Sequence, residues 1–444
     1  MNILIINGSP KGQYSITLQT CLFVQQKFNQ HRFTILNVGQ TIKALEKDFT
    51  PALRAVNEAD MLLFSYPVYT FIVPSQLHRF VELLKEHNVD LKGKWATQIS
   101  TSKHFYDITA HRFIRENALD LGLKYIDGLS ADMDDLLTEK GRSEAIGFFN
   151  LVMWSVEHDF YAVPQQVELT PCRKVDVLQP TTKLSGKRVV VVTDLLPDDE
   201  QLKSLIERFC NVFPYETDIF NIRKFAFGGG CLSCFNCSTD GKCIYKDGFD
   251  DYLRSNIQKH DAIVSAFNIR DHSMGSRFKM YDDRQFCNGH RTVTMGMPFG
   301  YIVSGNYSKE PNLQMIIEGR AEVGGNFLAG VATDEFDPNK AIDQMSQQLT
   351  YALDNHYTRP SNFLGVGGMK IFRDLIYLMR GMMRADHKFF KAHNQYDFPQ
   401  KKRGTALKMY LVGMLIGNPK IKAKMGNKMN EGMIAPYKKV LEKK

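Results

Sequence analysis

The chain has 444 residues and a formal net charge of +8, with 43% hydrophobic and 23% charged residues. This composition is ordinary for a soluble globular protein of two or three domains. The first residues, MNILIINGSPKG, lack a basic segment and a long apolar core, so we expect no signal peptide. No apolar stretch reaches the roughly 20 residues that span a bilayer, and we expect a cytoplasmic protein.

The positive charge is concentrated at the C-terminal end. Residues 361–444 hold 18 Lys and Arg against five Asp and Glu, a net +13, which leaves −5 for the rest of the chain. Nucleic acid is not an expected partner, because the body is acidic and no nucleic-acid module is recognised. The tail either folds over the body with a solvated basic face or binds an acidic protein or an anionic membrane surface.

The first elements predict a parallel strand, a polar loop and a helix. Asn2–Asn7 is a continuous apolar run, typical of a strand covered on both faces, and an amphipathic helix is expected from about residue 18 to 30. The intervening GSPKGQYSIT has the composition of an anion site at a helix start, although a plain N-cap would explain the same residues. Neither G-x-x-x-x-G-K-[ST] nor G-x-G-x-x-G is present, so neither a nucleoside triphosphate nor a Rossmann dinucleotide is indicated.

Further strands are predicted at residues 32–38, 61–65, 95–100 and 125–129, and a helix at 139–156. Met61–Ser65 opens into an aromatic, Pro-containing loop, Tyr66–Pro74. In a doubly wound sheet this loop and the polar loop lie at the same edge, where ligands bind. Its aromatic side chains line a ligand or, alternatively, pack against the helices.

GSPK…S-x-T followed by SYPVY…VPSQL resembles the flavodoxin-like family of NAD(P)H-dependent FMN reductases and quinone reductases. The resemblance implies that the first loop holds the FMN phosphate and that the second lies against the flavin ring. Three groups of residues carry these roles: Ser9, Ser15, Thr17 and, as a helper, Lys11 for the phosphate; Pro67, Val68, Tyr69 and Thr70 for the ring; and Ser100, Thr101 and Ser102 for its pyrimidine edge. No catalytic residue is assigned.

The pattern restarts after a polar, Pro-containing linker. Strands are predicted at 188–193, 216–222, 262–266, 299–304 and 327–333, so DAIVSAFNIRDHS matches DMLLFSYPVYT in position and the fold repeats. We therefore predict an α/β protein with two tandem flavodoxin-like, doubly wound, five-stranded parallel sheets and a basic helical tail. The expected parts are an FMN-binding domain (1–165), a linker (166–187), a second domain (188–360) and a Met-rich tail (361–444).

Four of the eight cysteines stand in FGGGCLSCFNCSTDGKCIYKDG. The C-x2-C-x2-C-x5-C spacing of Cys231, Cys234, Cys237 and Cys243 is similar to that of a bacterial [4Fe–4S] loop with a local fourth ligand. Structural zinc and free or redox-switching thiols are the alternatives. Gly228, Gly229, Gly230 and Gly241 would supply unusual backbone dihedrals there. The other cysteines are scattered: Cys21 and Cys210 suit core positions, and Cys287 has no assigned role.

The two halves differ in complementary ways. The second half has Asp194-Leu-Leu-Pro-Asp-Asp-Glu200 at the phosphate-loop position, and these four carboxylates would repel a phosphate. It carries the cysteines after its second strand, as in the iron–sulfur flavoproteins, in which one subunit's cluster approaches another subunit's flavin. Family members generally keep the phosphate loop and the cysteine motif in one domain, whereas in this sequence each half has one of the two. Arg270 and His272, at the position of the flavin loop, favour a structural or surface role over a catalytic one.

These patterns predict an enzyme, an FMN-dependent NAD(P)H oxidoreductase that passes electrons through an iron–sulfur cluster to a small-molecule or protein acceptor. The co-substrate is NADH or NADPH, and the chain is a monomer or an oligomer. One alternative is a plain NAD(P)H:quinone or nitro-compound FMN reductase with structural or zinc-binding cysteines. A non-enzyme alternative is a flavin- and zinc-binding interaction protein whose tail is the working part.

Overall fold

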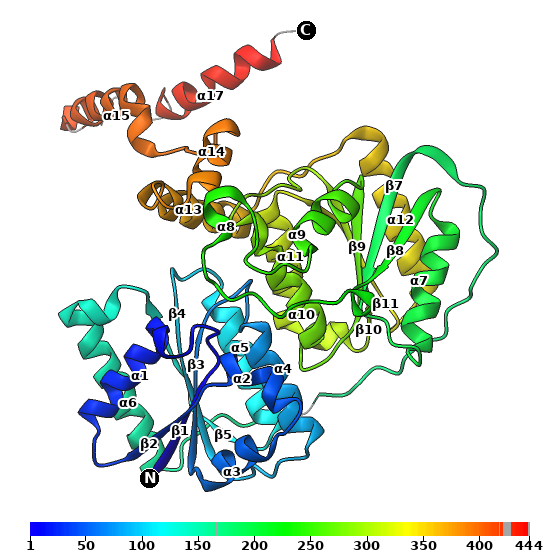
Figure 1. The fold of residues 1–444 in the computed structure, drawn as a ribbon. Helices are drawn as coiled ribbons and strands as arrows, with labels where there is room; N and C mark the ends of the chain where they lie inside the picture. Colours follow the sequence, from blue (N-terminus) through cyan, green and yellow to red (C-terminus); the bar gives the residue numbers. More distant parts are fainter. Residues whose placement is uncertain (165–166, 417, 421–427, 443–444) are drawn as a thin grey trace. The chain divides into compact units, whose positions relative to one another are not determined.

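The computed structural model describes residues 1–164, 167–416, 418–420 and 428–442. The chain divides into two compact units, Met1–Lys388 and Phe389–Lys444. The first unit holds both sheets and the helix that follows them, and the second is helical (Figure 1).

The first sheet is parallel and has the strand order β2-β1-β3-β4-β5, with β6 also paired to β4. Its strands are β1 (Asn2–Asn7), β2 (Arg32–Leu36), β3 (Met61–Pro67), β4 (Trp95–Ser102), β5 (Lys124–Tyr125) and β6 (Leu129–Asp132). β5 pairs with the start of β4 and β6 with its end, so these two short strands share the fifth position. The sheet has the predicted doubly wound arrangement, but two short strands stand where the sequence predicts one strand at residues 125–129, so it has six strands.

Helices cover both faces of the first sheet. They are α1 (Ile16–Lys27), α2 (Val38–Leu45), α3 (Thr50–Glu58), α4 (Ser75–Glu86), α5 (Asp107–Asp120) and α6 (Glu139–Glu157). Ile3 and Ile5 pack with α1 and α6, whereas Leu4 and Ile6 pack with the helices of the opposite face. Burial on both faces explains why β1 is an unbroken apolar run.

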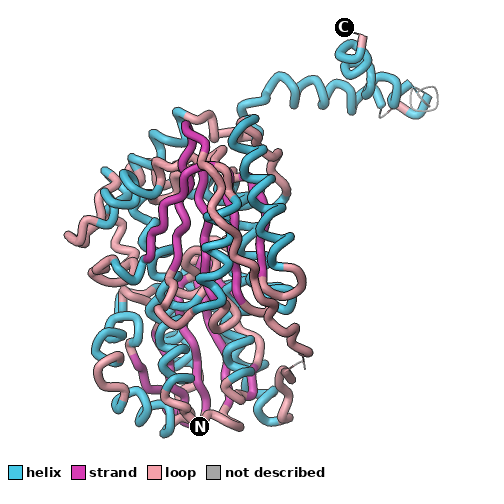
Figure 2. The backbone as a smooth tube through the Cα atoms, turned by 90° about the vertical axis from the view of Figure 1, so that its right-hand side faces the viewer, coloured by secondary structure: helices cyan, strands magenta, loops and turns pink. Residues whose placement is uncertain are grey.

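The second sheet repeats this topology, with five parallel strands in the order β11-β10-β9-β7-β8. Its strands are β7 (Leu184–Thr193), β8 (Tyr215–Asn221), β9 (Ala262–Asn268), β10 (Pro298–Ser304) and β11 (Phe327–Thr333). One face packs on α7 (Glu200–Val212) and α12 (Pro338–Asn355). The other face packs on α10 (Gly275–Arg284) and α11 (Pro311–Gly324). Figure 2 shows the strands enclosed between helices.

The two domains meet through equivalent helices. α4 and α10 follow the third strand of their respective domains and pack on each other, and α5 packs on α11 in the same way. One apolar cluster continues from the first domain into the second. The loops before α4 and α10 also repeat, because Thr70–Phe71 and Asp271–His272 all have positive φ within equivalent Tyr69–Ile72 and Arg270–Ser273 bridges. The fused domains therefore pair about a pseudo-two-fold axis.

The C-terminal region begins inside the first unit. α13 (Phe363–Leu378) packs on α11, and α14 (Arg384–Ala392) follows it. The second unit contains α15 (Arg403–Ile416) and α17 (Lys428–Leu441), which gives the helical tail that the sequence predicts. Among the described residues, no helix is long and apolar enough to cross a membrane.

Candidate functional site

A cavity of about 590 Å³ lies between the two domains of the first unit. The predicted residues that line it come from both domains: Ser9, Lys11, Ser15, Thr17, Pro67, Val68, Tyr69, Thr70, Thr101, Ser102, Cys231, Cys234, Cys237 and Cys243. Ser100 is the exception among the predicted site residues. Its hydroxyl lies 2.8 Å from Nε2 of His111, within the first domain, and burial lowers the pKa of that histidine to about 4.

The phosphate-type loop ends at the start of α1. Ser15 is the N-cap, and its hydroxyl accepts a hydrogen bond from the backbone N–H of Leu18. The first N–H groups of a helix have no partner within the helix, so the N–H groups of Ile16 and Thr17 are available to an anion. Oγ1 of Thr17 lies 2.6 Å from Oγ1 of Thr101, and this contact joins the first loop to the end of β4.

The loop after β3 is held by the second domain. Lys279 and Asp283, one helical turn apart on α10, form an ion pair whose side chains are both 0% exposed. Lys279 Nζ donates to the carbonyl of Tyr69 at 3.0 Å, and the backbone N–H of Ser75 donates to Asp283 at 2.8 Å. Thr70 hydrogen-bonds to both charged groups. A charged pair from one domain therefore fixes a loop of the other in its left-handed conformation.

Tyr69 has the features expected of a ligand-facing side chain. It lines the cavity but is only 6% exposed, and among the described residues its hydroxyl finds no hydrogen-bond partner. Burial, with the nearby Cys231 and Asp283, raises the pKa of Tyr69 well above its usual value. A buried hydroxyl without a partner is costly, so a bound molecule that accepts this hydrogen bond would be stabilised.

The cysteine loop combines glycines with strained residues. Gly229 and Gly241 have positive φ, as predicted, but Gly228 and Gly230 do not, and Ser233 and Phe235 take left-handed conformations between the cysteines instead. None of the four cysteines forms a disulfide. Burial, together with the charges of Cys243 and Cys234, raises the pKa of Cys237 to about 11.

Contacts with the first domain fix the position of this loop. Lys43 donates to the carbonyl of Gly228, and the Gln76 amide donates to the carbonyl of Cys231 at 3.2 Å. A Cβ at Gly230 would lie 2.4 Å from the Ser75 hydroxyl, so a larger residue there would displace the Ser75 side chain. On the cavity side, the Lys11 ammonium lies 5.0 Å from the centre of the Phe235 ring. Burial lowers the pKa of Lys11, while the charges of Cys234 and Cys231 raise it.

The four cysteines of the loop could hold either of two metal centres. Four thiolates ligate structural zinc and also iron–sulfur clusters. In the described part of the chain, two groups of three or more ligand-type side chains have their ligand atoms within 4.8 Å of one another, and neither contains a cysteine. The chemistry of the donor set therefore fits a cluster and zinc alike.

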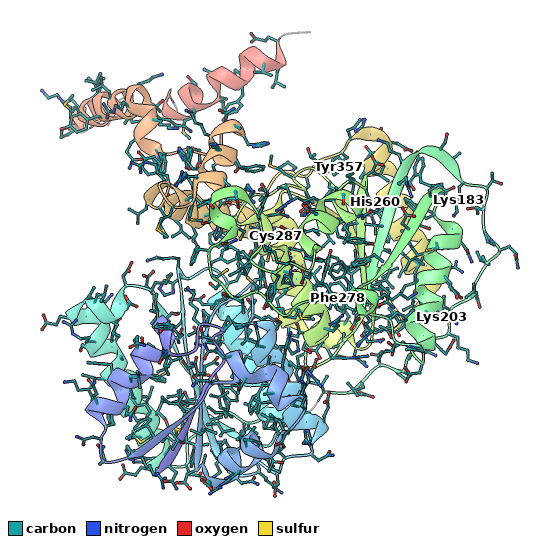
Figure 3. The ribbon with its side chains drawn as sticks, viewed as in Figure 1. Lys183, Lys203, His260, Phe278, Cys287 and Tyr357 are labelled. Carbon is teal, nitrogen blue, oxygen red and sulfur yellow. The ribbon has the colours of Figure 1, made fainter. Side chains whose placement is uncertain are left out.

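Sequence reasoning missed several residues of the cavity. Cys287 (Figure 3) is buried and lines it as a fifth cysteine, and burial raises the pKa of its thiol to about 12. Arg284 lines it as well, and its guanidinium forms a double ion pair with Asp247 at 2.7 and 2.8 Å. α13 contributes Phe372, which packs 4.5 Å from Phe105 between ring centres. The sequence predicts a helical tail, but not that α13 would face a cavity.

The equivalent edge of the second sheet is acidic and is covered by the linker. Arg173 N–H donates to the Asp334 carbonyl at 2.7 Å, and the Cys172 thiol lies 3.3 Å from the Asp334 carboxylate. Thr170 N–H donates to the side chain of Asn306. Asp194, at the phosphate-loop position, is buried and pairs with Arg223 at 3.2 Å. This edge has no counterpart of the Ser15 and Thr17 anion site among these residues.

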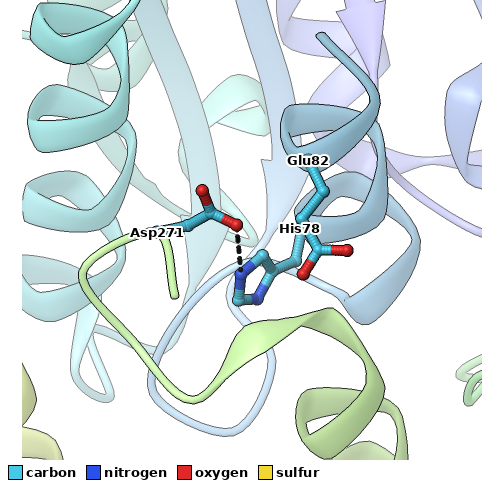
Figure 4. A group of neighbouring side chains, drawn as sticks. All are labelled: His78, Glu82 and Asp271. Carbon is cyan, nitrogen blue, oxygen red and sulfur yellow. Dashed lines mark ion pairs between the residues drawn. The ribbon is translucent and has the colours of Figure 1, made fainter. Parts of the chain in front are cut away.

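One of the two ligand-type groups, His78, Glu82 and Asp271, lies at the seam between the domains (Figure 4). His78 Nε2 is 3.5 Å from Asp271, and Lys85 is 2.8 Å from the other oxygen of Asp271. Glu82 accepts a hydrogen bond at 2.6 Å from the backbone N–H of Ser276. Because both carboxylates already have partners from the other domain, we interpret this group as an interdomain ion-pair network.

The second group is centred on His272 and is also structural. Its two ring nitrogens each lie 3.0 Å from a carboxylate, one from Glu310 and one from Asp120. Burial alone would lower the pKa of His272, but these two carboxylates raise it to about 10. The imidazolium therefore connects the first domain to the second, in agreement with the structural role that the sequence favours.

The strand order and the loops at the C-terminal edge of the first sheet define a flavodoxin-like α/β protein. Residues 1–112 match the family model described as NADPH-dependent FMN reductase. This match confirms the predicted resemblance for the first domain. No curated protein matches the chain.

Solved structures of similar fold cover about a third of the chain. An FMN-dependent NADH-azoreductase from Bacillus anthracis is 13% identical and covers 36% of this chain and 100% of its own, with a TM-score of 0.27. An NAD(P)H:quinone oxidoreductase from Methanothermobacter marburgensis is 12% identical, with coverages of 35% and 95% and a TM-score of 0.28. An NADPH-quinone reductase from P. pentosaceus is 14% identical, with coverages of 34% and 97% and a TM-score of 0.28.

Proposed function

We propose that the protein is an FMN-dependent NAD(P)H oxidoreductase whose four-cysteine loop holds a [4Fe–4S] cluster that serves a redox acceptor. One observation supports this most directly: the phosphate-type loop, the aromatic loop and the four cysteines line the same cavity. The family match of residues 1–112 supports the flavin part. The C-x2-C-x2-C-x5-C sequence spacing of the cysteines is the support for a cluster.

The residues present fit FMN. The helix start at Ser15–Thr17 offers backbone donors to a phosphate, and Lys11 adds a positive charge beside it. The unpartnered hydroxyl of Tyr69 offers a further donor. Bound FMN would supply hydride acceptance from NAD(P)H and release of electrons one at a time, and a cluster would supply single-electron transfer.

The protein's own residues supply position and exclude water. Lys279 and Asp283 fix the loop after β3, and Gln76 and Gly230 hold the cysteine loop against the first domain. Phe372 and its neighbours on α13 add apolar lining, which reduces the access of solvent. Fixed positions matter because redox centres must lie close together for electrons to pass between them.

Substitution of one cysteine tests the cluster. Cys234→Ser replaces a soft thiolate by a hydroxyl, a poor ligand for iron. We expect loss of acid-labile sulfide and of the broad visible absorbance in anaerobically purified protein, with flavin content and its reduction by NAD(P)H retained. Reduction of a one-electron acceptor should slow at least about tenfold. Cys210→Ser, on α7, is the matched control and should change none of these quantities.

Two results would contradict the cluster proposal. One zinc and no iron in the wild-type protein would make the cysteines a zinc site. Wild-type rates with a one-electron acceptor in Cys234→Ser would make them structural. Either result favours the plain quinone or nitro-compound reductase.

The proposal places FMN on the first domain alone. Ser15→Asp combined with Thr17→Asp puts two carboxylates at the expected phosphate position, which should cost several kcal/mol of binding in a partly buried site. We expect about one flavin per chain in the wild-type protein and almost none in the double variant. Two flavins per chain, or undiminished flavin in the variant, would refute this placement.

A further inference from the structure

The second compact unit is strongly basic. Residues 389–444 contain 13 Lys and Arg against three Asp and Glu, a net charge of +10. A charge of this size in 56 residues exceeds what solubility alone requires. Such a segment attracts an anionic surface over about 10 Å at 0.1 M salt.

α17 combines this charge with an apolar stripe. Met433, Ile434, Tyr437, Val440 and Leu441 recur at intervals of three and four residues, which places them on one side of the helix. Their exposed fractions run from 47% to 83%. Lys438 borders this apolar side. An apolar helix side bordered by basic residues is typical of a segment that lies in a membrane interface.

α15 is apolar around most of its circumference. Leu407, Met409, Tyr410, Leu411, Met414 and Leu415 are all about half exposed or more, from 49% to 70%. A helix that is hydrophobic all round is normally buried. Three basic residues directly precede its apolar part: Lys401, Lys402 and Arg403. When the apolar part enters a membrane interface, these residues can contact the lipid head groups.

The length of these helices limits how they can meet a membrane. Each has 14 residues, about 21 Å at 1.5 Å per residue, whereas the hydrocarbon core is about 30 Å thick. They are therefore suited to the interface rather than to crossing it. An acidic protein partner would account for the charge but not for the exposed apolar side chains, whereas a lipid interface takes up basic and apolar side chains together.

We propose that residues 389–444 dock the protein on the surface of an anionic lipid bilayer. The lysines and arginines contact the anionic head groups, and the apolar side chains of α15 and α17 enter the boundary between head groups and acyl chains. This inference rests on the second unit alone and does not depend on the proposed function.

Vesicle flotation of the full-length protein tests the proposal. Vesicles of phosphatidylcholine with 30% phosphatidylglycerol should bind at least about tenfold more strongly than pure phosphatidylcholine at 0.1 M salt. Raising the salt to 1 M shortens the screening length to about 3 Å and should remove most of this difference. Ile434→Asp with Tyr437→Asp should weaken binding at least about tenfold, because two apolar side chains lose their burial.

A matched control separates this surface from general charge effects. Leu137→Asp with Leu151→Asp changes two exposed apolar side chains of the first unit, 78% and 57% exposed, and alters the net charge equally. This control should bind vesicles like the wild-type protein.

Four outcomes would overturn the proposal. In the first, the protein binds neither type of vesicle; in the second, it binds both types equally. In the third, the Leu137 and Leu151 control loses as much vesicle binding as the Ile434 and Tyr437 variant. In the fourth, the protein binds polyglutamate in a salt-sensitive way that the Ile434 and Tyr437 changes do not affect, and it does not bind vesicles. The last would indicate an acidic protein partner.

Discussion

Replacing Lys279 by methionine should destabilise the first domain, although Lys279 belongs to the second. Methionine has nearly the same length as lysine but removes the charge and the donors to Tyr69 and Thr70. Asp283 would remain fully buried without its ion-pair partner. The loop after β3 would lose part of what holds its left-handed conformation.

The magnitude follows from the burial of the pair. Breaking a buried ion pair by removing one partner costs about 3–5 kcal/mol, because the remaining charge is left uncompensated. Lys140→Met is the matched control, since Lys140 and Glu144 are also four residues apart on a helix but are 85% and 48% exposed. An exposed pair of this kind is worth about 0.3–0.5 kcal/mol. The two variants should therefore differ by several kcal/mol.

Tryptophan fluorescence during denaturant unfolding can measure this difference. The two tryptophans, Trp95 and Trp154, both lie in the first domain, so their signal reports on that domain. Lys279→Met should lower the midpoint and the retention of flavin, and Lys140→Met should change neither. Lys279→Met with Asp283→Leu should recover part of the loss, because the buried charge is gone. A midpoint shift in Lys279→Met no larger than that in Lys140→Met would refute the reasoning.

Three further variants test other parts of the structure. His272→Asn should remove a contribution to stability that is complete below pH 6.5 and is lost as the pH rises through about 10, and a pH series of unfolding midpoints that is unchanged by the substitution would contradict this. Tyr69→Phe should stabilise the flavin-free protein by about 1 kcal/mol, since it removes an unpartnered buried hydroxyl, and weaken FMN binding measured by titration; tighter FMN binding would be the opposite result. Gly230→Ala should lower stability because the added Cβ contacts Ser75. Gly147→Ala, at a solvent-facing position of α6 with no neighbouring atoms, should raise stability by about 0.5–1 kcal/mol. Equal effects of the two variants on the thermal unfolding midpoint would show that the cysteine loop is not closely packed on the first domain.

The sequence was sufficient to predict the strands and the loops that follow them. Strands buried on both faces leave continuous apolar runs, such as Asn2–Asn7, and these are visible without a structure. The residues of both loops were predictable because Gly, Ser, Thr and Pro mark strand ends. The cysteines were found from their spacing alone. Only Ser100, whose hydroxyl turns toward His111, fell outside the cavity.

Contacts between the domains could not be predicted from the sequence. Lys279 and Asp283 stand in a helix of charged residues, GSRFKMYDDR, and such a helix normally faces solvent. Its burial depends on a loop of the other domain, more than 200 residues earlier in the chain. The positive φ of Ser233 and Phe235 could not be predicted either, because neither residue type favours that conformation and only the surrounding loop imposes it.

The pseudo-two-fold packing of two fused domains affects which substitutions each half can accept. In a symmetric dimer of identical subunits, every substitution appears twice, so a residue needed at one site cannot be lost at the other. Here the equivalents of Thr70 and Phe71 are Asp271 and His272. Asp271 and His272 form ion pairs with the first domain, while Thr70 still lines the cavity. Covalent fusion therefore lets the same turn geometry form a cavity-lining loop in one half and an interdomain ion-pair contact in the other.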